Sequence, residues 1–257
     1  MTAPARRRSS LRSFAIALVV APLTLGLAAC QKDPAEVTAP SGAAIANIAP
    51  PAGKLWSDTV VVTPEGGYRM GNPLAPIKLI EYGSLTCSHC ADFSEKGSAQ
   101  LRDNFVASGR VSFEFRNFVR DAIDMTAAQL TQCGAPESFF ALTDQAFTNQ
   151  AAMFERAQAA GQETYGAAMS LPPAKRGPAL AELTGLTEFF AARGISRDQA
   201  NACLLDTAKA EKLAQNTTKQ GEELKIEGTP TFLINGQKLD TNTWEGLKVE
   251  LEKAGAR

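Results

Sequence analysis

The sequence has almost no histidine and few cysteines, which restricts the metal and nucleophilic sites that it can build. Its 257 residues include one histidine, His89, and five cysteines, and the net charge is −1. A zinc site needs four ligands, so a cysteine pair here would have to recruit distant cysteines or carboxylates. The near-neutral charge gives no indication of nucleic-acid binding. A hydrolase with a Cys-His pair is disfavoured because the one histidine lies inside a cysteine motif.

A long apolar run lies at the N-terminus. Basic residues at Arg6–Arg8 and Arg12 precede the run Phe14–Leu27, which Pro22 interrupts and small residues follow. This pattern is typical of an export signal and argues against a lasting membrane span. We therefore predict a signal peptide over residues 1–29.

The end of this signal contains a cysteine in a specific setting. Leu27-Ala28-Ala29-Cys30 resembles a bacterial lipobox, in which cleavage leaves the cysteine as the lipid-bearing first residue. The resemblance implies that a lipid on Cys30 anchors the protein, facing the periplasm, to the inner or outer membrane of a Gram-negative-type bacterium. An ordinary signal with a chance cysteine is the alternative. Gln31 leaves the choice of membrane open.

Two further cysteines are three residues apart, in Cys87-Ser88-His89-Cys90. The apolar stretch 76–82 before them predicts a buried strand, and the fourfold spacing of Phe93, Gly97, Leu101 and Phe105 predicts a helix after them. Cys87 would then lie at a helix N-terminus, where free backbone N–H groups favour its thiolate. A protonated His89 would add positive charge, although an exposed His89 with little effect is the alternative.

This arrangement predicts a redox-active disulfide between Cys87 and Cys90. A stabilised Cys87 thiolate is a good leaving group, which makes the disulfide easier to reduce and more oxidising toward other thiols. Cys90, one turn later, would face inward and resolve a mixed disulfide. Half of a zinc site or a plain structural bridge are the alternatives.

The remaining cysteines, Cys133 and Cys203, form an even pair for an oxidising compartment. Cys133 ends a helical stretch, and Cys203 follows the capping-box pattern Ser196-Arg-Asp-Gln199. A bridge across this loop would stabilise the fold by about 4 kcal/mol, less any strain. Two separate buried thiols are the alternative, because the sequence does not give their separation.

The rest of the chain divides into a linker and one domain. Residues 30–54 are rich in alanine and proline without an amphipathic period, which predicts a flexible tether. Residues 55–257 are enough for one domain. We expect strands near 59–62, 76–82, 111–118 (half-buried), 230–234 and 237–239, a helical insertion over about 122–223, and a last helix with Trp244, Leu247 and Leu251 on one face.

Taken together, these residues resemble the DsbA-like thiol:disulfide oxidoreductases. The Cys87–Cys90 motif, Glu81 six residues before it, Gly228-Thr-Pro-Thr-Phe232 and the helical insertion carry the resemblance. It implies an α/β thioredoxin-like fold, a central mixed sheet flanked by helices, with an inserted all-helical subdomain.

The resemblance also implies roles for three residues. Pro230 would be cis against the redox pair, and the Thr229 backbone would pair with an extended substrate. Glu81 would be a buried acid of raised pKa that exchanges a proton with Cys90. A trans Pro230 that opens a strand and a solvated edge-strand Glu81 are the alternatives.

The implied function is that of an exported oxidoreductase that introduces disulfide bonds into periplasmic proteins. Its substrates would be unfolded exported proteins with free thiols, a DsbB-type membrane partner would reoxidise it, and no cofactor or metal is expected. Contact with the membrane would come only from the lipid anchor. Ser88, where strong oxidants commonly have proline, and Thr229 keep an isomerase or reductase open. A non-enzymatic lipoprotein that binds a thiophilic metal is a more distant alternative.

Overall fold

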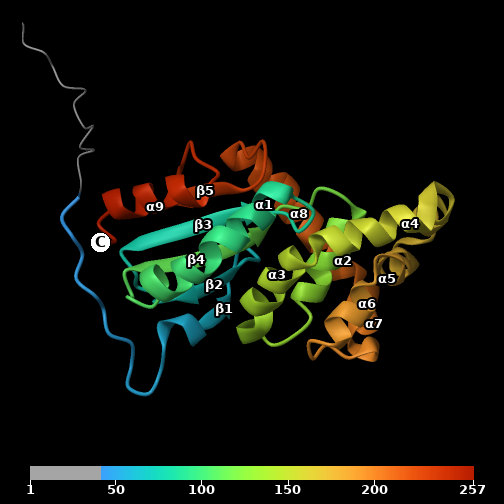
Figure 1. Ribbon diagram of the computed structural model, residues 1–257, viewed down its shortest axis with the longest axis horizontal. Coiled ribbons are helices and arrows are strands. Elements are labelled where there is room, and N and C mark those ends of the chain that lie inside the picture. The colour runs from blue at the N-terminus through green and yellow to red at the C-terminus, as the bar shows by residue number, and fades with distance from the viewer. Residues whose placement is uncertain (1–41) are drawn as a thin grey trace, which may run out of the picture. The chain divides into compact units, whose positions relative to one another are not determined.

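A mixed sheet lies at the centre of the computed structural model, which describes residues 42–257 (Figure 1). Strands β3 and β4 run parallel, and every other neighbouring pair is antiparallel. The order across the sheet is β1 (Val60–Val62), β2 (Tyr68–Gly71), β4 (Val111–Asn117), β3 (Ile77–Gly83), β5 (Thr231–Ile234) and β6 (Gln237–Lys238).

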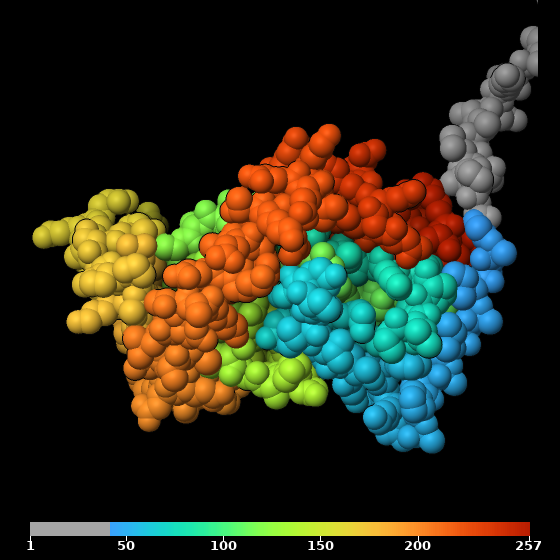
Figure 2. All heavy atoms as spheres, turned by 180° about the vertical axis from the view of Figure 1, so that it is seen from behind, coloured from blue at the N-terminus to red at the C-terminus, as the bar shows by residue number. Residues whose placement is uncertain are grey.

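The helical insertion leaves the sheet after β4 and returns to it before β5. Figure 1 shows its helices gathered at one end of the sheet, next to the start of α1. Its helices are α2 (Ala122–Thr131), α3 (Phe139–Thr148), α4 (Gln150–Met169), α5 (Pro173–Thr184), α6 (Leu186–Ala191), α7 (Arg197–Leu205) and α8 (Thr207–Leu224). In the view from behind, a band of orange atoms leads from the insertion to the red atoms of the C-terminal segment (Figure 2). The predicted fold class is confirmed.

The helical segment after the redox motif is wound less regularly than its sequence pattern predicts. Helix α1 (Ser88–Phe93) continues into π-helical segments at Ser94–Ser98 and Leu101–Val106. Residues four apart drift around an α-helix of 3.6 residues per turn, and the wider π turns offset that drift. Phe93, Gly97, Leu101 and Phe105 therefore all stay buried.

The last helix packs against this segment through an aromatic ring. Helix α9 (Trp244–Lys253) buries Trp244, Leu247 and Leu251. The Trp244 ring lies so close to Gly97 that a Cβ there would be 2.8 Å from it. Glycine at 97 is thus a packing requirement, which the spacing of apolar residues could not reveal.

Strand β4 is buried on both faces, so its prediction as half-buried was wrong. The polar residues Ser112 and Glu114 are only 2 % and 7 % exposed. The strand lies between β2 and β3, with α3 aromatic rings on one face, where Phe140 contacts Phe113. A polar network covers its other face. The alternation of apolar and polar residues does not reveal that a polar network buries the second face of the strand.

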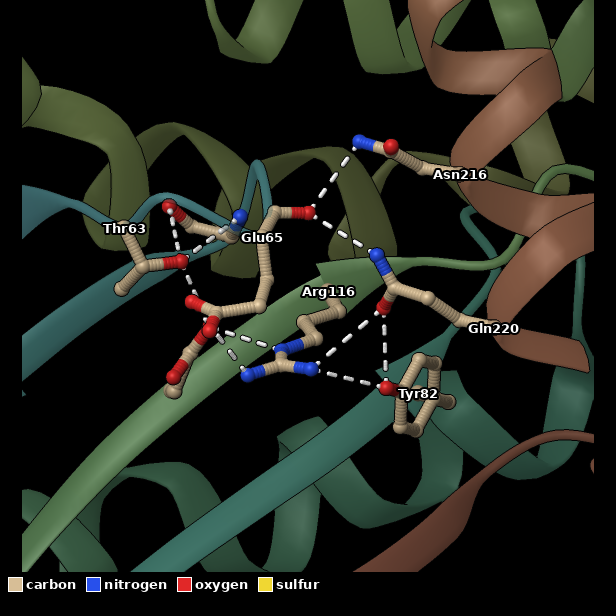
Figure 3. A network of polar contacts seen from close by, with 8 residues as sticks. Thr63, Glu65, Tyr82, Arg116, Asn216 and Gln220 are labelled. Atoms are coloured by element: carbon tan, nitrogen blue, oxygen red, sulfur yellow. Dashed lines mark hydrogen bonds and ion pairs between the residues drawn. The ribbon is translucent and has the colours of Figure 1, made fainter. Parts of the chain in front are cut away.

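That network joins the sheet to α8 (Figure 3). Arg116 on β4 donates to Glu114 at 2.7 Å and to the Tyr82 hydroxyl at 2.9 Å. The Tyr82 hydroxyl in turn donates to Gln220 of α8 at 2.9 Å. The buried charges are therefore paired, and the returning helix is held at a defined position on the sheet.

Strand β2 was not predicted. Tyr68 and Met70 point into the core, and the Tyr68 ring stacks on Phe139 with centroids 3.9 Å apart. The strand has four residues and ends in Gly71, which is too short for a clear period-2 pattern. Its pairing with β4, distant in sequence, stabilises it.

The flexible tether predicted for residues 30–54 is wrong for the part that the structure describes. Backbone hydrogen bonds of 2.9–3.0 Å join Gly42 to Lys253, Ile45 to Gly255 and Ile48 to Ser108. The Trp56 indole also donates to the Ile48 carbonyl. Main-chain pairing of this kind needs no amphipathic pattern, so composition could not predict it.

Two N-terminal predictions lie outside the described residues: the signal peptide over 1–29 and the lipid on Cys30. Within residues 42–257, none of the helices is long and apolar enough to cross a membrane.

Candidate active site

Cys87 and Cys90 lie where β3 passes into α1. Cys87 occupies the N-cap position of α1, and Cys90 lies one turn later. Both carry free thiols and are buried, Cys87 at 3 % and Cys90 at 0 % exposed. The first peptide N–H groups of the helix therefore lie next to the Cys87 sulfur.

The segment Gly228–Pro230 lies next to the two thiols because of how β3 and β5 pair in the sheet. Tyr82 near the end of β3 pairs with Thr231 at the start of β5. The loops beyond these strand ends therefore meet, and Cys87 Sγ lies 3.1 Å from the Thr229 carbonyl oxygen. The Thr229–Pro230 peptide bond is cis. The trans alternative is wrong.

The surroundings of Cys87 favour its thiolate. A hydrogen bond from the Cys90 thiol, followed by donors from Thr229 and the peptide N–H groups of Cys90 and His89, lowers the Cys87 pKa to about 4 against the opposing effect of burial. As a thiol, Cys87 donates to the Thr229 carbonyl, and the buried Thr229 hydroxyl has no partner. That hydroxyl becomes a donor once the sulfur carries the charge.

Cys90 is held in the opposite state. Burial is the main cause that raises its pKa well above the ordinary value, and the hydrogen bond to Cys87 and the nearby Glu81 add to it. One sulfur of the pair is thus stable as an anion and the other as a neutral thiol. This asymmetry suits Cys87 to leave or attack as a thiolate and Cys90 to react inside the protein.

Glu81 lies inside the protein on a central strand. β3 lies between β4 and β5, and Glu81 is 2 % exposed, so the edge-strand alternative is wrong. Burial, with smaller effects from Asp144 and Cys87, raises its pKa well above the ordinary value. Its Oε1 atom has no hydrogen-bond partner. A neutral carboxyl group here could give a proton to a nearby sulfur or take one from it.

His89 is exposed, and it is the peptide N–H of this residue that contributes to the lowered Cys87 pKa. The Cys90 thiol, then Thr229 and the helix N–H groups, therefore lower the Cys87 pKa without the imidazole charge that the sequence suggested.

The family model described as Thioredoxin matches residues 63–253, which include the redox motif, the insertion and the cis-proline loop. The chain belongs to the thioredoxin family. This thioredoxin-family chain is also similar to a protein-disulfide isomerase from Novosphingobium aromaticivorans, whose crystal structure is known. The sequence identity is 36 % and the TM-score is 0.67, over 71 % of this chain and 94 % of that one.

Other relatives of this thioredoxin-family chain are more distant. Wolbachia pipientis alpha-DsbA1 shares its fold at 22 % identity and a TM-score of 0.59, over 76 % of this chain and 95 % of that one. A Rickettsia bellii protein, named provisionally as a protein-disulfide oxidoreductase, is 23 % identical over 72 % of this chain and 63 % of its own length. The chain thus spans less than two thirds of that relative. The predicted resemblance is confirmed: the chain belongs to the thioredoxin family and shares the fold of a DsbA protein.

Cys133 and Cys203 are joined by a disulfide with their Cα atoms 5.9 Å apart. The bond ties the end of α2 to α7, so the alternative of two separate thiols is wrong. Ser196 caps α7 as predicted by accepting from the Gln199 N–H, but the Gln199 side chain donates to the Cys133 carbonyl instead of completing the capping box.

Sequence reasoning missed the polar residues that hold the loop before Cys87. Gln150 at the start of α4 donates to the carbonyls of Leu85 and Cys87, at 2.9 and 3.0 Å. Asp124 of α2 is 0 % exposed and accepts from Leu85 N–H at 2.8 Å. Asp121 could be recognised as a helix-capping residue from its position, but its contact to the loop could not. Among residues 42–257, no group of three His, Cys, Asp or Glu is placed to hold a metal ion.

The buried Glu81 predicts an effect of pH on stability. Its pKa is raised above the ordinary 4.5, so the folded state binds its proton more tightly and this contribution is lost as pH rises above about 4.5. Glu81→Gln removes the titration. We expect the free energy of unfolding of E81Q to increase relative to that of wild type by at least about 1 kcal/mol between about pH 4.5 and 7.5 in urea titrations, because only wild type loses this contribution.

Glu95→Gln is the matched control, because Glu95 is exposed on the π-helical segment after α1. It should show no such change. An E81Q difference that does not vary with pH would contradict the raised pKa of Glu81.

Proposed function

We propose that this chain is an exported thiol-disulfide oxidoreductase that donates the Cys87–Cys90 disulfide to unfolded proteins with free thiols. The single observation that carries this proposal is the geometry of the two thiols: Cys87 lies at the start of α1, 3.1 Å from the Thr229 carbonyl oxygen, and Cys90 is buried one turn later. This arrangement lowers the Cys87 pKa to about 4 and raises that of Cys90. A low-pKa thiol leaves easily, which favours transfer of the disulfide to the substrate.

The exchange follows from this asymmetry. A substrate thiolate attacks Cys87 Sγ, the Cys87–Cys90 bond breaks, and Cys90 leaves and takes up a proton from the neutral Glu81. A second substrate thiolate then attacks the substrate sulfur of the mixed disulfide, and Cys87 leaves as a stabilised thiolate. The substrate loses two electrons and gains a disulfide, while the redox pair gains the two electrons.

The substrate segment would bind beside the cis-proline loop. A cavity of about 330 Å³ opens next to Cys87's partner Thr229 and is lined by Gly228, Pro230, Lys238 and Asp240 among others. The main chain at this loop could hydrogen-bond an extended peptide, which would give affinity without requiring one sequence. This fits substrates that share only a thiol and an unfolded chain.

The setting of the enzyme is proposed from the sequence. Export by the signal over 1–29, with lipid on Cys30, would place the domain in the periplasm at the inner or outer membrane. There it would meet exported proteins, and a membrane partner of DsbB type would restore the disulfide. Isolation of the protein from cells and mass analysis of its N-terminal peptide would test the lipid.

An isomerase or reductase is the second candidate, since the Novosphingobium relative at 36 % identity is called a protein-disulfide isomerase. Equilibration of residues 31–257 with a glutathione redox buffer separates the two. We expect a reduction potential of roughly −120 to −160 mV, as for an oxidase. A potential of about −250 mV or below would overturn disulfide donation and favour the reductase.

A further inference from the structure

A buried carboxyl group lies directly behind the loop that carries Cys87. Asp124 accepts from the Ser84 hydroxyl at 2.6 Å, from Leu85 N–H at 2.8 Å and from Arg120 N–H at 3.0 Å. It is 0 % exposed. The mechanism above does not use it, and its three donors come from the redox loop and the segment between β4 and α2.

A second carboxyl group, that of Asp121, is linked to the first through two hydroxyls. The Thr86 hydroxyl donates to Asp121 at 2.7 Å, and the Ser84 and Thr86 oxygens are 3.2 Å apart. Asp121 is exposed at the N-cap of α2. The four side chains therefore form one chain of polar contacts from the interior to solvent, and its last hydroxyl belongs to the residue before Cys87.

The hydrogens in this chain can be placed in two ways. With both carboxyls ionised, each hydroxyl donates to its own carboxylate, and no hydrogen lies between Ser84 and Thr86. With one proton on Asp124, the carboxyl donates to Ser84, Ser84 donates to Thr86, and Thr86 still donates to Asp121. Each of the three contacts is then a hydrogen bond that donates in the direction of the Asp121 carboxylate. Hydrogen bonds aligned in this way strengthen one another.

We propose that Asp124 is a positioning residue for the redox loop and that a hydrogen-bond chain through Ser84 and Thr86 to Asp121 stabilises its protonated form, so that the loop has two hydrogen-bonded states that differ by one charge behind the segment leading to Cys87. The proposal rests on the proposed function only in taking Cys87 as the reacting thiol.

The groups around Asp124 agree with this proposal. Burial, as the main cause, raises the Asp124 pKa to about 7, and the charge of Asp121 also raises it. Its other partners are neutral: Ser84, and the peptide N–H groups of Leu85 and Arg120. Gln150, which holds the same loop from α4, is neutral too. Other ionisable side chains near Cys87 are those of Glu81, buried on β3, and His89, exposed on α1, so both must be controlled for.

The test compares two alkylating reagents on the reduced protein. Iodoacetate is an anion and iodoacetamide is neutral, so the ratio of their rates at Cys87 cancels the thiolate fraction and reports nearby charge. As pH rises from about 5.5 to 8.5 the ratio should fall about threefold, since an added negative charge repels the anion. The midpoint should lie near the Asp124 pKa of about 7.

Four variants separate the groups. Asp124→Asn should remove the fall, whereas Glu81→Gln and His89→Gln should each keep it. Thr86→Val keeps the three donors of Asp124 but breaks the chain to Asp121, which destabilises the protonated state and should lower the midpoint by about half a pH unit or more. T86V also retains the buried contacts of Asp124, so it tests the hydrogen-bond chain even if D124N folds poorly.

A flat wild-type ratio, or a fall that persists in D124N, would overturn the proposal. An unchanged midpoint in T86V would overturn the stabilisation of protonated Asp124 by the chain to Asp121. Alkylation needs no substrate turnover, so these outcomes are independent of whether the protein donates disulfides. Failure of the proposed function would appear instead as a low reduction potential with the titration intact.

Discussion

Replacing Cys87 by alanine is expected to abolish thiol-disulfide exchange, with a rate lowered by at least about a thousandfold. Cys87 is the sulfur whose thiolate is stabilised, since its pKa is lowered to about 4 while that of Cys90 is raised. No other free thiol lies among residues 42–257. The measurement is the rate of exchange with a disulfide-containing peptide.

Cys90→Ala is the matched variant and should behave differently. Its Cys87 can still attack a peptide disulfide, but the internal thiol that would release the peptide is gone, so a mixed disulfide on Cys87 should accumulate. Mass spectrometry of the non-reduced protein would show it. Equal loss of the first attack in both variants, or exchange that survives in C87A, would contradict the assigned roles.

Removal of the Cys133–Cys203 bridge should lower the free energy of unfolding by about 4 kcal/mol, as expected for the loss of a cross-link over a long loop. The two cysteines are 70 residues apart and connect α2 to α7. The double variant Cys133→Ala, Cys203→Ala avoids leaving an unpaired thiol. Denaturant unfolding measures the change, and the thermal midpoint should fall by about 10 °C.

The control is Cys87→Ala, Cys90→Ala, which also replaces two cysteines but removes no bond in the reduced protein. Under reducing conditions that leave Cys133–Cys203 intact, it should be destabilised less than the bridge variant. If the two double variants unfold at the same denaturant concentration, the bridge does not restrict the unfolded chain as expected.

Local patterns in the sequence predicted the elements that carry the redox pair. The apolar run before Cys87 and the buried face of the last helix, with Trp244 and Leu247, are properties of neighbouring residues, so they can be recognised without a structure. Strand β2 could not be recognised, because four residues are too few for a clear alternation and one of its two partners lies more than forty positions away.

The same distinction applies to the site. The sequence shows the Cys-x-x-Cys spacing, the position of Glu81 and the Thr229-Pro230 dipeptide. It does not show that these residues lie close together in the folded protein. Thr229 is 142 residues from Cys87, and they lie 3.1 Å apart because β3 and β5 are neighbours in the sheet. Asp124 left no recognisable signal, since an aspartate in the first turn of a helix is ordinarily a surface residue.

The sequence by itself determined the chemistry available to this protein: a pair of thiols at a predicted helix start, with one histidine in the whole chain. Only the tertiary structure decided how those thiols ionise. The pKa values of Cys87, Cys90 and Glu81 depend on burial and on donors from distant segments. Desolvation and hydrogen-bond geometry arise only when those segments pack together.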